Sequence, residues 1–291
     1  MTKFGIDVSK WQGEFDFARA KSEGVEFVIL RGAYSTGKDT KFESYYSKCK
    51  SLNLPVGVYH YSMAQTVDQA KAEAEFLLKN VLKGKQFELP IYIDVEDKTQ
   101  LALSKGALTE IVKTWCSYLE SRGYFVGIYA SKWTFETELN DSELIRYTHW
   151  IAQWDKKCTY KGDYAMWQFG GETNKIRSTQ ICGQTVDQDY MYSDFPTRIK
   201  RLKLNGYGNT TETKKPVTGA SDASQTIYNI GDKIELKSGA TYYDGTRIPT
   251  WVMNSILYIR SKELNNGDYH ISVLTSGAIT GRVNKKYFTK K

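Results

Sequence analysis

The sequence predicts an α/β protein, an irregular (β/α) barrel of eight strands with fewer helices than strands, followed by a small all-β domain. Three observations lead to this prediction. Apolar strand-like segments alternate with amphipathic helical segments in the first part of the chain. The helices become scarce after the fifth strand, and the composition changes abruptly near residue 205.

Short, mostly apolar segments mark the predicted strands, at 4–9, 27–32, 56–62, 89–96, 125–131, 149–154, 164–169 and 184–191. Helical spacing marks the predicted helices, at 16–24, 42–53, 67–82 and 106–122. Strict alternation over the first five strands favours a parallel sheet covered by helices. Eight strands in about 200 residues fit a barrel that has lost some helices. A doubly wound open sheet is the rival, but no G-x-G-x-x-G follows the first strand.

The chain divides into three parts by composition. Residues 1–204 form the predicted barrel domain, and residues 205–226 form a linker of Gly, Asn, Thr, Lys, Ser and Pro. Residues 227–291 carry short strands, predicted at 233–236, 241–243, 256–260, 269–274 and 279–288. Turn signals separate them at Asp244-Gly245, at 265–268 and at Ser276-Gly277. These features predict a small β-barrel domain.

Composition narrows the chemistry. Aromatic residues make up 14% of the chain, with 21 Tyr and 7 Trp, which suits a protein that binds sugar rings. Only 3 His are present, which argues against a multi-His metal site, and we expect neither a metal nor a cofactor. The four cysteines, Cys49, Cys116, Cys158 and Cys182, form no C-x-x-C and are expected to be mostly buried free thiols.

The net charge of +7 is concentrated at the C-terminal end. From residue 205 onward there are twelve Lys and Arg and seven Asp and Glu, so five of the seven net charges lie there. This asymmetry indicates an anionic partner, which is nucleic acid, a bacterial wall polymer or a membrane surface. No nucleic-acid motif is present. The chain shows no signal peptide and no apolar run of transmembrane length, so we expect it to be made in the cytoplasm.

A pair of acids closes the fourth predicted strand. Asp94 and Glu96 stand two positions apart in Ile-Tyr-Ile-Asp-Val-Glu, so their side chains point to the same face, with Cα atoms about 6.6 Å apart. Two close carboxyls hinder each other's ionisation, which costs stability. Such a pair, one acid protonated and one ionised, is typical of general acid catalysis.

Other polar and aromatic residues fall at the ends of the predicted strands. In a (β/α) barrel these ends line the active site. The acids are Asp7 on the first strand and Asp187 and Asp189 on the last. The remaining candidates for substrate binding are Tyr34, Tyr59, Tyr61, Tyr129, Trp154 and Gln168. We expect all of them to converge on Asp94 and Glu96.

Several segments resemble the family 25 glycoside hydrolases, the Chalaropsis-type lysozymes. Gly-Ile-Asp-Val-Ser-Lys-Trp-Gln-Gly at 5–13 resembles the opening signature of that family, and 56–61 its third strand. Ile-Asp-Val-Glu at 93–96 matches its D-x-E. Later strands match at 127–129, 150–154, 167–168 and 186–187. The resemblance covers residues 3 to 195, in order.

The resemblance implies hydrolysis of the β-1,4 bond between N-acetylmuramic acid and N-acetylglucosamine, with retention of configuration. Glu96 would protonate the leaving oxygen. Asp94 would act as nucleophile or stabilise an oxazolinium formed by the N-acetyl group of the substrate. Asp7 and Asp187 would orient the substrate, with the tyrosines lining the sugar site. The family usually has Asn where this chain has Asp189, so we expect added negative charge and a raised pKa of a neighbouring acid.

The C-terminal part resembles bacterial SH3-like cell-wall binding domains, at 228–232 and 277–281. A barrel domain, a linker and a wall-binding module without a signal peptide resemble a phage endolysin. That resemblance implies synthesis in the host cytoplasm and action on the wall after release. The expected partners are peptidoglycan and anionic Gram-positive wall polymers, without nucleic acid or membrane, and self-association through the C-terminal domain is a further option.

Two alternatives stay open at this point. One is a non-catalytic wall-binding protein built on a hydrolase fold, against which the acids at all matching positions argue. The other is a glucosaminidase, which cleaves the neighbouring bond of the same polymer.

Overall fold

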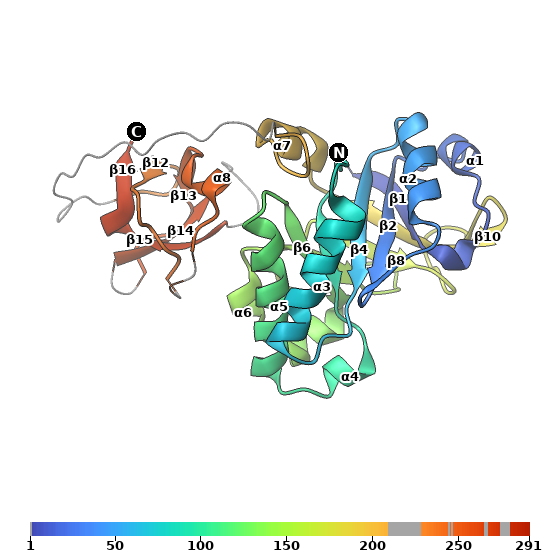
Figure 1. The fold of residues 1–291 in the computed structure, drawn as a ribbon, viewed down its shortest axis with the longest axis horizontal. Coiled ribbons are helices and arrows are strands. Elements are labelled where there is room, and N and C mark those ends of the chain that lie inside the picture. Colours follow the sequence, from blue (N-terminus) through green and yellow to red (C-terminus); the bar gives the residue numbers. More distant parts are fainter. Residues whose placement is uncertain (1, 209–227, 244, 246, 265–266, 274–279) are drawn as a thin grey trace.

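The computed structural model describes residues 2–208, 228–243, 245, 247–264, 267–273 and 280–291 (Figure 1). Two units follow each other along the chain. The first is a closed barrel with helices packed outside it, and the second is a small antiparallel sheet. Both the barrel and the all-β unit were predicted from the sequence.

Eight strands close the barrel, each near its predicted position. They are β1 (Lys3–Val8), β2 (Phe27–Tyr34), β4 (Val56–Tyr61), β5 (Ile91–Asp94), β6 (Val126–Ser131), β7 (Thr148–Ala152), β8 (Met166–Gly170) and β11 (Asp187–Met191). Their order is β1-β11-β8-β7-β6-β5-β4-β2, and pairing of β1 with β2 closes the ring. A short strand, β3 (Gly37–Lys38), extends β2.

The alternation of strands and helices favoured a parallel sheet. The last strand of the barrel, however, does not run parallel to the others. β11 is antiparallel to both β1 and β8. The connection at 171–186, which is fully described, holds only the hairpin of β9 (Gln180–Ile181) and β10 (Gln184–Thr185) and no helix. A parallel return needs a long crossover, usually helical, so this segment returns antiparallel. Consequently the start of β11, and not its end, lies beside the ends of the parallel strands.

Alternate residues along each strand divide between two cores. Outward side chains, such as Ile6, Leu30 and Ile93, pack under the helices, whereas Tyr92 and Trp150 fill the interior of the barrel. Glycines make room for these large rings. At Gly127, a Cβ atom would lie 2.4 Å from the ring of Tyr92 and 2.6 Å from Thr148, so no larger residue fits there.

Helices cover the outside of the barrel. They are α1 (Phe17–Ser22), α2 (Phe42–Ser51), α3 (Val67–Leu77), α4 (Lys98–Leu101), α5 (Lys105–Glu120), α6 (Asp141–Leu144) and α7 (Phe195–Arg201). The four predicted helical segments correspond to α1, α2, α3 and α5. The single-turn helices α4 and α6 escaped prediction because four residues show no helical period. Three other helical segments are η1 (Lys10–Gln12), η2 (Leu78–Leu82) and η3 (Thr134–Glu138).

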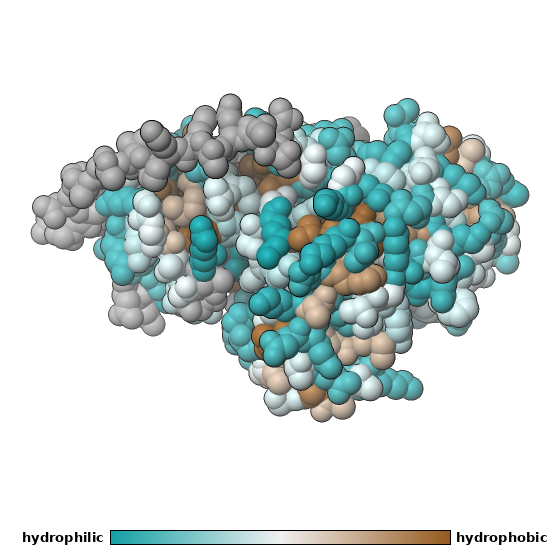
Figure 2. Space-filling model, in the orientation of Figure 1, coloured by the Kyte–Doolittle hydropathy of each residue, from teal (hydrophilic) through white to brown (hydrophobic). Residues whose placement is uncertain are grey.

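The helix α5 illustrates how the sequence forms these elements. Ser104 caps its start, accepting a hydrogen bond from the backbone NH of Ala107 at 3.4 Å. Its buried stripe has the predicted helical spacing and includes Leu108, Ile111, Val112, Trp115 and Leu119. The stripe packs against α3 and the outward side of β5 and β6. Figure 2 shows that hydrophilic residues cover most of the face on which α3 and α5 lie.

The C-terminal unit is a five-stranded antiparallel sheet with its own core. Its strands are β12 (Lys233–Leu236), β13 (Leu257–Ile259), β14 (Asp268–Ser272), β15 (Gly281–Asn284) and β16 (Phe288–Lys290), in the order β15-β14-β13-β12-β16. The helical turns α8 (Thr250–Met253) and η5 (Lys285–Tyr287) complete it. Tyr228, Tyr269 and Phe288 stack edge to face or tilted in the core.

Two predicted strands of this unit differ in detail. The strand expected at 241–243 is a single bridge between Thr241 and Arg247. The strand expected at 279–288 is split into β15 and β16, because the Asn284 side chain caps the turn η5 by accepting from Lys286 N at 3.1 Å. The predicted turns at Asp244, at 265–266 and at Ser276-Gly277, and most of the linker, lie outside the described residues.

The segment 205–208 packs with the barrel. Asn205, where the predicted linker begins, is fully buried. Its side chain accepts from the backbone NH of Phe125 at 2.7 Å and donates to the carbonyl of Leu89 at 2.8 Å. These bonds tie the segment after α7 to the strands β5 and β6.

The two units touch through a small set of residues. Leu202, which ends α7, and Trp251 each pack against the inner barrel core and against the core of the sheet. Arg146 forms an ion pair with Glu120, lies 3.8 Å from the ring centre of Tyr242 and donates to the carbonyl of Thr280 at 3.3 Å. Within the described part of the chain, no helix is long and apolar enough to cross a membrane.

Candidate active site

Five carboxyl groups meet at one end of the barrel. Asp7 is the last but one residue of β1, Asp94 ends β5, and Glu96 follows two residues later. Asp187 and Asp189 lie at the start of β11, where Asp187 pairs with Asp7 across the strands. The antiparallel direction of β11 is the reason that these two acids reach the same end. The structure therefore brings together all five acids selected from the sequence.

Asp94 and Glu96 occupy different depths on the same face, and Val95 between them is buried in the outer core. The side chain of Asp94 is 3% exposed, and its Oδ1 has no hydrogen-bond partner among the described residues. The side chain of Glu96 is exposed at the mouth of the barrel. A buried acid below an accessible one leaves only Glu96 open to a large substrate.

The pKa values of both acids are raised. Burial is the main cause for Asp94, followed by the negative charges of Glu96 and Asp7, and the positive charge of Arg31 opposes them. For Glu96, loss of surrounding water at the barrel mouth comes first, followed by the charge of Asp97. The two groups interact, so a proton retained near neutral pH belongs to the pair.

Gln168 on β8 holds several site residues in one network. Its Oε1 accepts from Tyr129 Oη at 2.9 Å and from Trp154 Nε1 at 3.0 Å. Its Nε2 donates to Asp7 Oδ2 at 2.8 Å. These three bonds fix the orientation of the amide, because the two donors require its oxygen on one side and the carboxylate requires its nitrogen on the other.

Asp187 lies at the rim of the barrel. Burial raises its pKa to about 7, and the charges of Glu96 and Glu172 add to the effect. Gly171 allows this placement, because a Cβ atom there would lie 2.0 Å from Asp187 Oδ1 and 2.8 Å from the ring of Trp154. Asp189 lies deeper and is fully buried.

The candidate tyrosines spread from the rim to the interior. Tyr34 is 45% exposed and stacks on Tyr61, with ring centres 4.8 Å apart. Tyr61 Oη donates to Asp97 Oδ2 at 3.3 Å, next to Glu96. Tyr59 points into the barrel and meets Trp150 edge to face at 6.4 Å. Two exposed aromatic residues at this end, Tyr34 and Trp154, offer flat surfaces of the kind that sugar rings contact.

Sequence reasoning missed two interior residues of this site. Arg31 on β2 is buried and pairs with Asp39 at 2.7 Å, and its charge acts on Asp94 and Tyr59. A charged residue inside the apolar strand 27–32 was the available signal. Trp150 was noted only as part of a motif, yet Tyr129, Tyr92 and Tyr59 surround its ring.

Two exposed tryptophans were also not among the candidate site residues chosen from the sequence. Trp11 in η1 is 76% exposed and Trp133 beside η3 is 56% exposed. Each follows a barrel strand, β1 or β6, at the end where the acids gather. Their position after a strand was the signal that could have found them.

No candidate for a metal or cofactor site emerges from the described residues. No group of three or more His, Cys, Asp or Glu in that part of the chain has an arrangement that could hold a metal ion. All four cysteines are free thiols, with Cys49 and Cys116 buried and the other two half-buried. What the acids can do directly is give and take protons.

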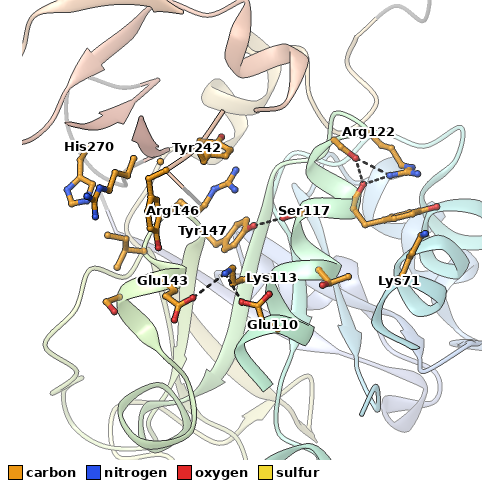
Figure 3. A pocket seen from close by; sticks show the side chains of 18 residues that line it. Lys71, Glu110, Lys113, Ser117, Arg122, Glu143, Arg146, Tyr147, Tyr242 and His270 are labelled. Carbon is orange, nitrogen blue, oxygen red and sulfur yellow. Dashed lines mark hydrogen bonds and ion pairs between the residues drawn. The ribbon is translucent and has the colours of Figure 1, made fainter. Parts of the chain in front are cut away.

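A large cavity lies away from these acids. It measures about 680 Å³ and opens between α5 and α6 of the barrel and the C-terminal sheet (Figure 3). Lys113 lies on its wall between Glu110 and Glu143, at 2.7 and 3.1 Å, while Arg146, Tyr147 and Tyr242 line its inner end. No candidate site residue lines this cavity, so its size does not mark the reactive centre.

The fold and the acids define the class: a (β/α)-barrel protein with an acidic site at the ends of its strands. The family model described as glycosyl hydrolases family 25 matches residues 6–177, more than half of the chain. The chain belongs to glycosyl hydrolases family 25.

Individual proteins show the same similarity. An autolytic lysozyme of Clostridium acetobutylicum is 29% identical over 176 residues, covering 59% of this chain and 52% of the relative. The chain thus spans about half the length of that curated relative. The CTP1L endolysin structure matches with a TM-score of 0.58 and 23% identity, covering 69% of this chain and 70% of that one. The autolysin LytC of Streptococcus pneumoniae, in complex with a synthetic peptidoglycan ligand, matches with a TM-score of 0.57 and 22% identity, covering 66% and 47%.

Proposed function

We propose that this protein is a peptidoglycan hydrolase, an N-acetylmuramidase that cleaves the β-1,4 bond between N-acetylmuramic acid and N-acetylglucosamine. The observation that carries the proposal is the accessible Glu96 above the buried Asp94, at the mouth of a family 25 barrel. The similarity to an autolytic lysozyme and to an autolysin bound to a synthetic peptidoglycan ligand supports the substrate class.

In the proposed mechanism Glu96 donates a proton to the glycosidic oxygen as the bond breaks. Its raised pKa supports this role, because a general acid must hold its proton near the working pH. Asp94 then bears negative charge below the sugar and stabilises the positive charge that develops at the reacting carbon. Burial and the charges of Glu96 and Asp7 raise the pKa of Asp94, and the positive charge of Arg31 opposes that rise, so in this proposal Arg31 helps Asp94 to give up its proton while Glu96 holds one.

Two roles for Asp94 are chemically distinct. As a nucleophile it would form a covalent bond to the sugar, and as a stabiliser it would face an oxazolinium ring made from the N-acetyl group of the substrate. A thiazoline that mimics the oxazolinium should inhibit strongly in the second case. In the first case a slow substrate should leave a sugar adduct on Asp94, which mass spectrometry detects.

The other candidate residues hold the substrate in this proposal. Tyr34 and Trp154 would contact sugar rings at the rim, and Asp7, Asp187, Gln168 and the inner tyrosines Tyr59, Tyr61 and Tyr129 would orient the reacting sugar. The network around Gln168 supports these roles, because each bond in it fixes a group that points toward the acid pair.

The central experiment compares the wild type with Glu96→Gln, which keeps shape and removes the proton. We expect wild type to clear suspensions of bacterial wall and the variant to lose at least about 10²-fold in rate, since general acid catalysis contributes roughly 10²–10⁴-fold. Far-ultraviolet circular dichroism and thermal unfolding serve as folding controls. A variant that keeps its activity would remove Glu96 from this role.

Mass spectrometry of the released muropeptides identifies which glycosidic bond is cleaved. Reducing ends on N-acetylmuramic acid support the muramidase, whereas reducing ends on N-acetylglucosamine identify a glucosaminidase. Absence of new reducing ends with the wild type would favour a non-catalytic wall-binding protein.

For the C-terminal unit we propose a wall-binding role of the SH3-like kind, and for the whole protein the role of a phage endolysin that reaches the wall after release from the cytoplasm. The excess of Lys and Arg after residue 205 supports attraction to anionic wall polymers. The Glu96→Gln protein should bind purified Gram-positive walls, and extraction of the anionic polymers should weaken binding. Sedimentation at increasing concentration tests self-association through this unit.

A further inference from the structure

Asp189 is a buried acid that cannot reach the rim of the site. It is 0% exposed and lies behind Asp7 on the interior face of β11. Its Oδ1 accepts from Trp150 Nε1 at 2.8 Å. Its Oδ2 is buried, and no donor for it exists among the described residues. One oxygen of this carboxyl is therefore satisfied and the other is not.

A second acid, Asp7, lies next to this carboxyl. The side chains of Asp189 and Asp7 lie within hydrogen-bonding contact of each other. An ionised carboxylate only accepts hydrogen bonds, so two ionised groups in contact would repel without any bond between them. A single proton between the two acids removes the repulsion and supplies the missing bond.

The surroundings decide which acid holds that proton. Asp7 already accepts from Gln168 Nε2 at 2.8 Å, a bond that favours the ionised form. Asp189 lies deeper, and the groups that face it are Asp7, Asp187, Trp150, Gln168 across the strands and the phenol of Tyr92. Neither a Lys nor an Arg is among them. Asp7 has acidic neighbours too, Asp187 and Glu96, so what separates the two acids is depth: Asp7 is 5% exposed and Asp189 0%, and the deeper acid is the one that holds the proton.

We propose that Asp189 stays protonated at neutral pH and donates a hydrogen bond from Oδ2 to the carboxylate of Asp7, as a neutral positioning residue of the active site. Burial, the negative charge of Asp7 and the hydrogen bond to Asp7 all raise the pKa of Asp189. The hydrogen bond from Trp150 lowers this pKa, but by less than the other effects raise it. Asp7 is then held by two donors, Asp189 and Gln168, in one orientation at the end of β1.

This changes the expectation drawn from the sequence. An acid in place of the Asn usual in the resembling family was expected to add negative charge. A protonated Asp189 adds none, because it donates and accepts as an amide does. It differs from an amide in one respect: at sufficiently high pH it loses the proton, and Asp7 then faces a second negative charge.

The inference rests on the proposed hydrolase activity for its first test, which compares Asp189→Asn with Asp189→Leu. Leu removes both hydrogen bonds and should lower the rate at pH 6 by about 10-fold or more, because Asp7 then keeps only the bond from Gln168 and loses its fixed orientation. Asn can accept from Trp150 and donate to Asp7, so it should restore most of that loss. Its activity should also persist to higher pH than that of the wild type.

Two results would overturn the proposal in this test. One is an Asp189→Asn protein as inactive as the Leu variant at pH 6, because the amide would then fail to replace a neutral acid. The other is an identical alkaline limit in the wild type and the Asn variant, because Asp189 would then not be the group that ionises.

A second measurement does not depend on activity and so separates this proposal from the proposed function. The infrared difference spectrum between wild type and Asp189→Asn at pH 7 should contain the C=O band of a protonated carboxylic acid in the wild type. The same difference in urea-unfolded protein should lack the band, because an exposed Asp is ionised at that pH. A carboxylate band in the folded wild type would refute the assignment.

Discussion

The interior of the barrel and the contact between the two units both bury ionisable side chains, but in different combinations. Inside the barrel, Asp7, Asp94 and Asp189 are 5%, 3% and 0% exposed, and each has its pKa raised by burial and by neighbouring acids. At the contact, the acid Glu120 and the base Arg146 are 8% and 11% exposed and form an ion pair. One region gathers like charges and the other pairs opposite charges.

The difference distinguishes function from structure. Like charges buried together oppose folding, so a protein keeps them only where the surrounding structure holds them in place, as active sites do. A paired charge with an aromatic ring over it holds two surfaces in register. We therefore place the proposed reactive centre at the acids, although a cavity of about 680 Å³ lies beside the ion pair.

The largest effect is expected at the deeper acid of the pair. Asp94→Asn removes the negative charge below the reacting sugar while keeping the volume. We expect the rate of wall clearance to fall about 10³-fold, which is about 4 kcal/mol in the barrier. The urea midpoint should stay the same or rise, because a buried acid without a partner for Oδ1 has been neutralised. A loss of both activity and stability would mean that Asp94 is structural.

The next effect belongs to the ion pair of the barrel unit that lies at the contact with the C-terminal sheet. Arg146→Met leaves Glu120 buried without its partner and should lower the free energy of unfolding by about 3 kcal/mol. Combining it with Glu120→Gln should recover part of the loss, and a double-mutant cycle measured in urea gives the coupling. Catalysis on short soluble substrates should be unchanged. A large drop in turnover would contradict the separation of the two regions.

A smaller effect, with a defined pH dependence, is expected at Asp187. Its pKa is near 7 in the folded protein and near 4 when unfolded, so the folded state retains a proton that the unfolded state loses. The stability linked to this group is therefore present below about pH 4 and is lost as the pH rises to about 7.

Asp187→Asn removes that dependence. Relative to wild type, the variant should gain about 2 kcal/mol of stability at pH 7.5, half of the full linkage value because the side chain is partly exposed. At pH 4 the two proteins should unfold at similar urea concentrations. A difference that is constant with pH would show that the change comes from packing and not from ionisation.

The smallest effect is expected at a surface pair of the C-terminal sheet. Lys285 reaches both oxygens of Glu263, at 2.9 and 3.0 Å, but both side chains contact solvent. Lys285→Ala should change the free energy of unfolding by no more than about 0.5 kcal/mol, and the change should vanish in 1 M salt. A larger, salt-independent effect would indicate a packing role for the lysine stem, and Lys285→Met is the matched control.

Much of the fold could be predicted because its signals are local. Apolar segments located each of the eight barrel strands within a few residues, and helical spacing located α5 with its buried stripe. The direction of β11 had no local signal, since an alternation of apolar residues is the same in parallel and antiparallel strands. Asn205 likewise has a linker-like sequence around it, but its amide bonds the backbone of Leu89 and Phe125, just before the starts of β5 and β6, and this buries it.

The candidate site shows the same division. Glu96 and Asp94 could be found because D-x-E at a strand end is unusual in an apolar segment. The sequence could not show that Gln168 joins Tyr129, Trp154 and Asp7, nor that Arg31 acts on Asp94, since these residues come from different strands. Only closure of the ring makes them neighbours.

The sequence by itself determined which side chains face the interior of the barrel, because the period of a strand fixes the face on which each residue lies. It also determined that acids stand at several strand ends. The tertiary structure decided their depth and their charge. Direction and register of β11 place Asp187 at the rim and Asp189 beneath Asp7, and burial then decides which acid ionises, because the cost of a charge depends on the water and the charges around it.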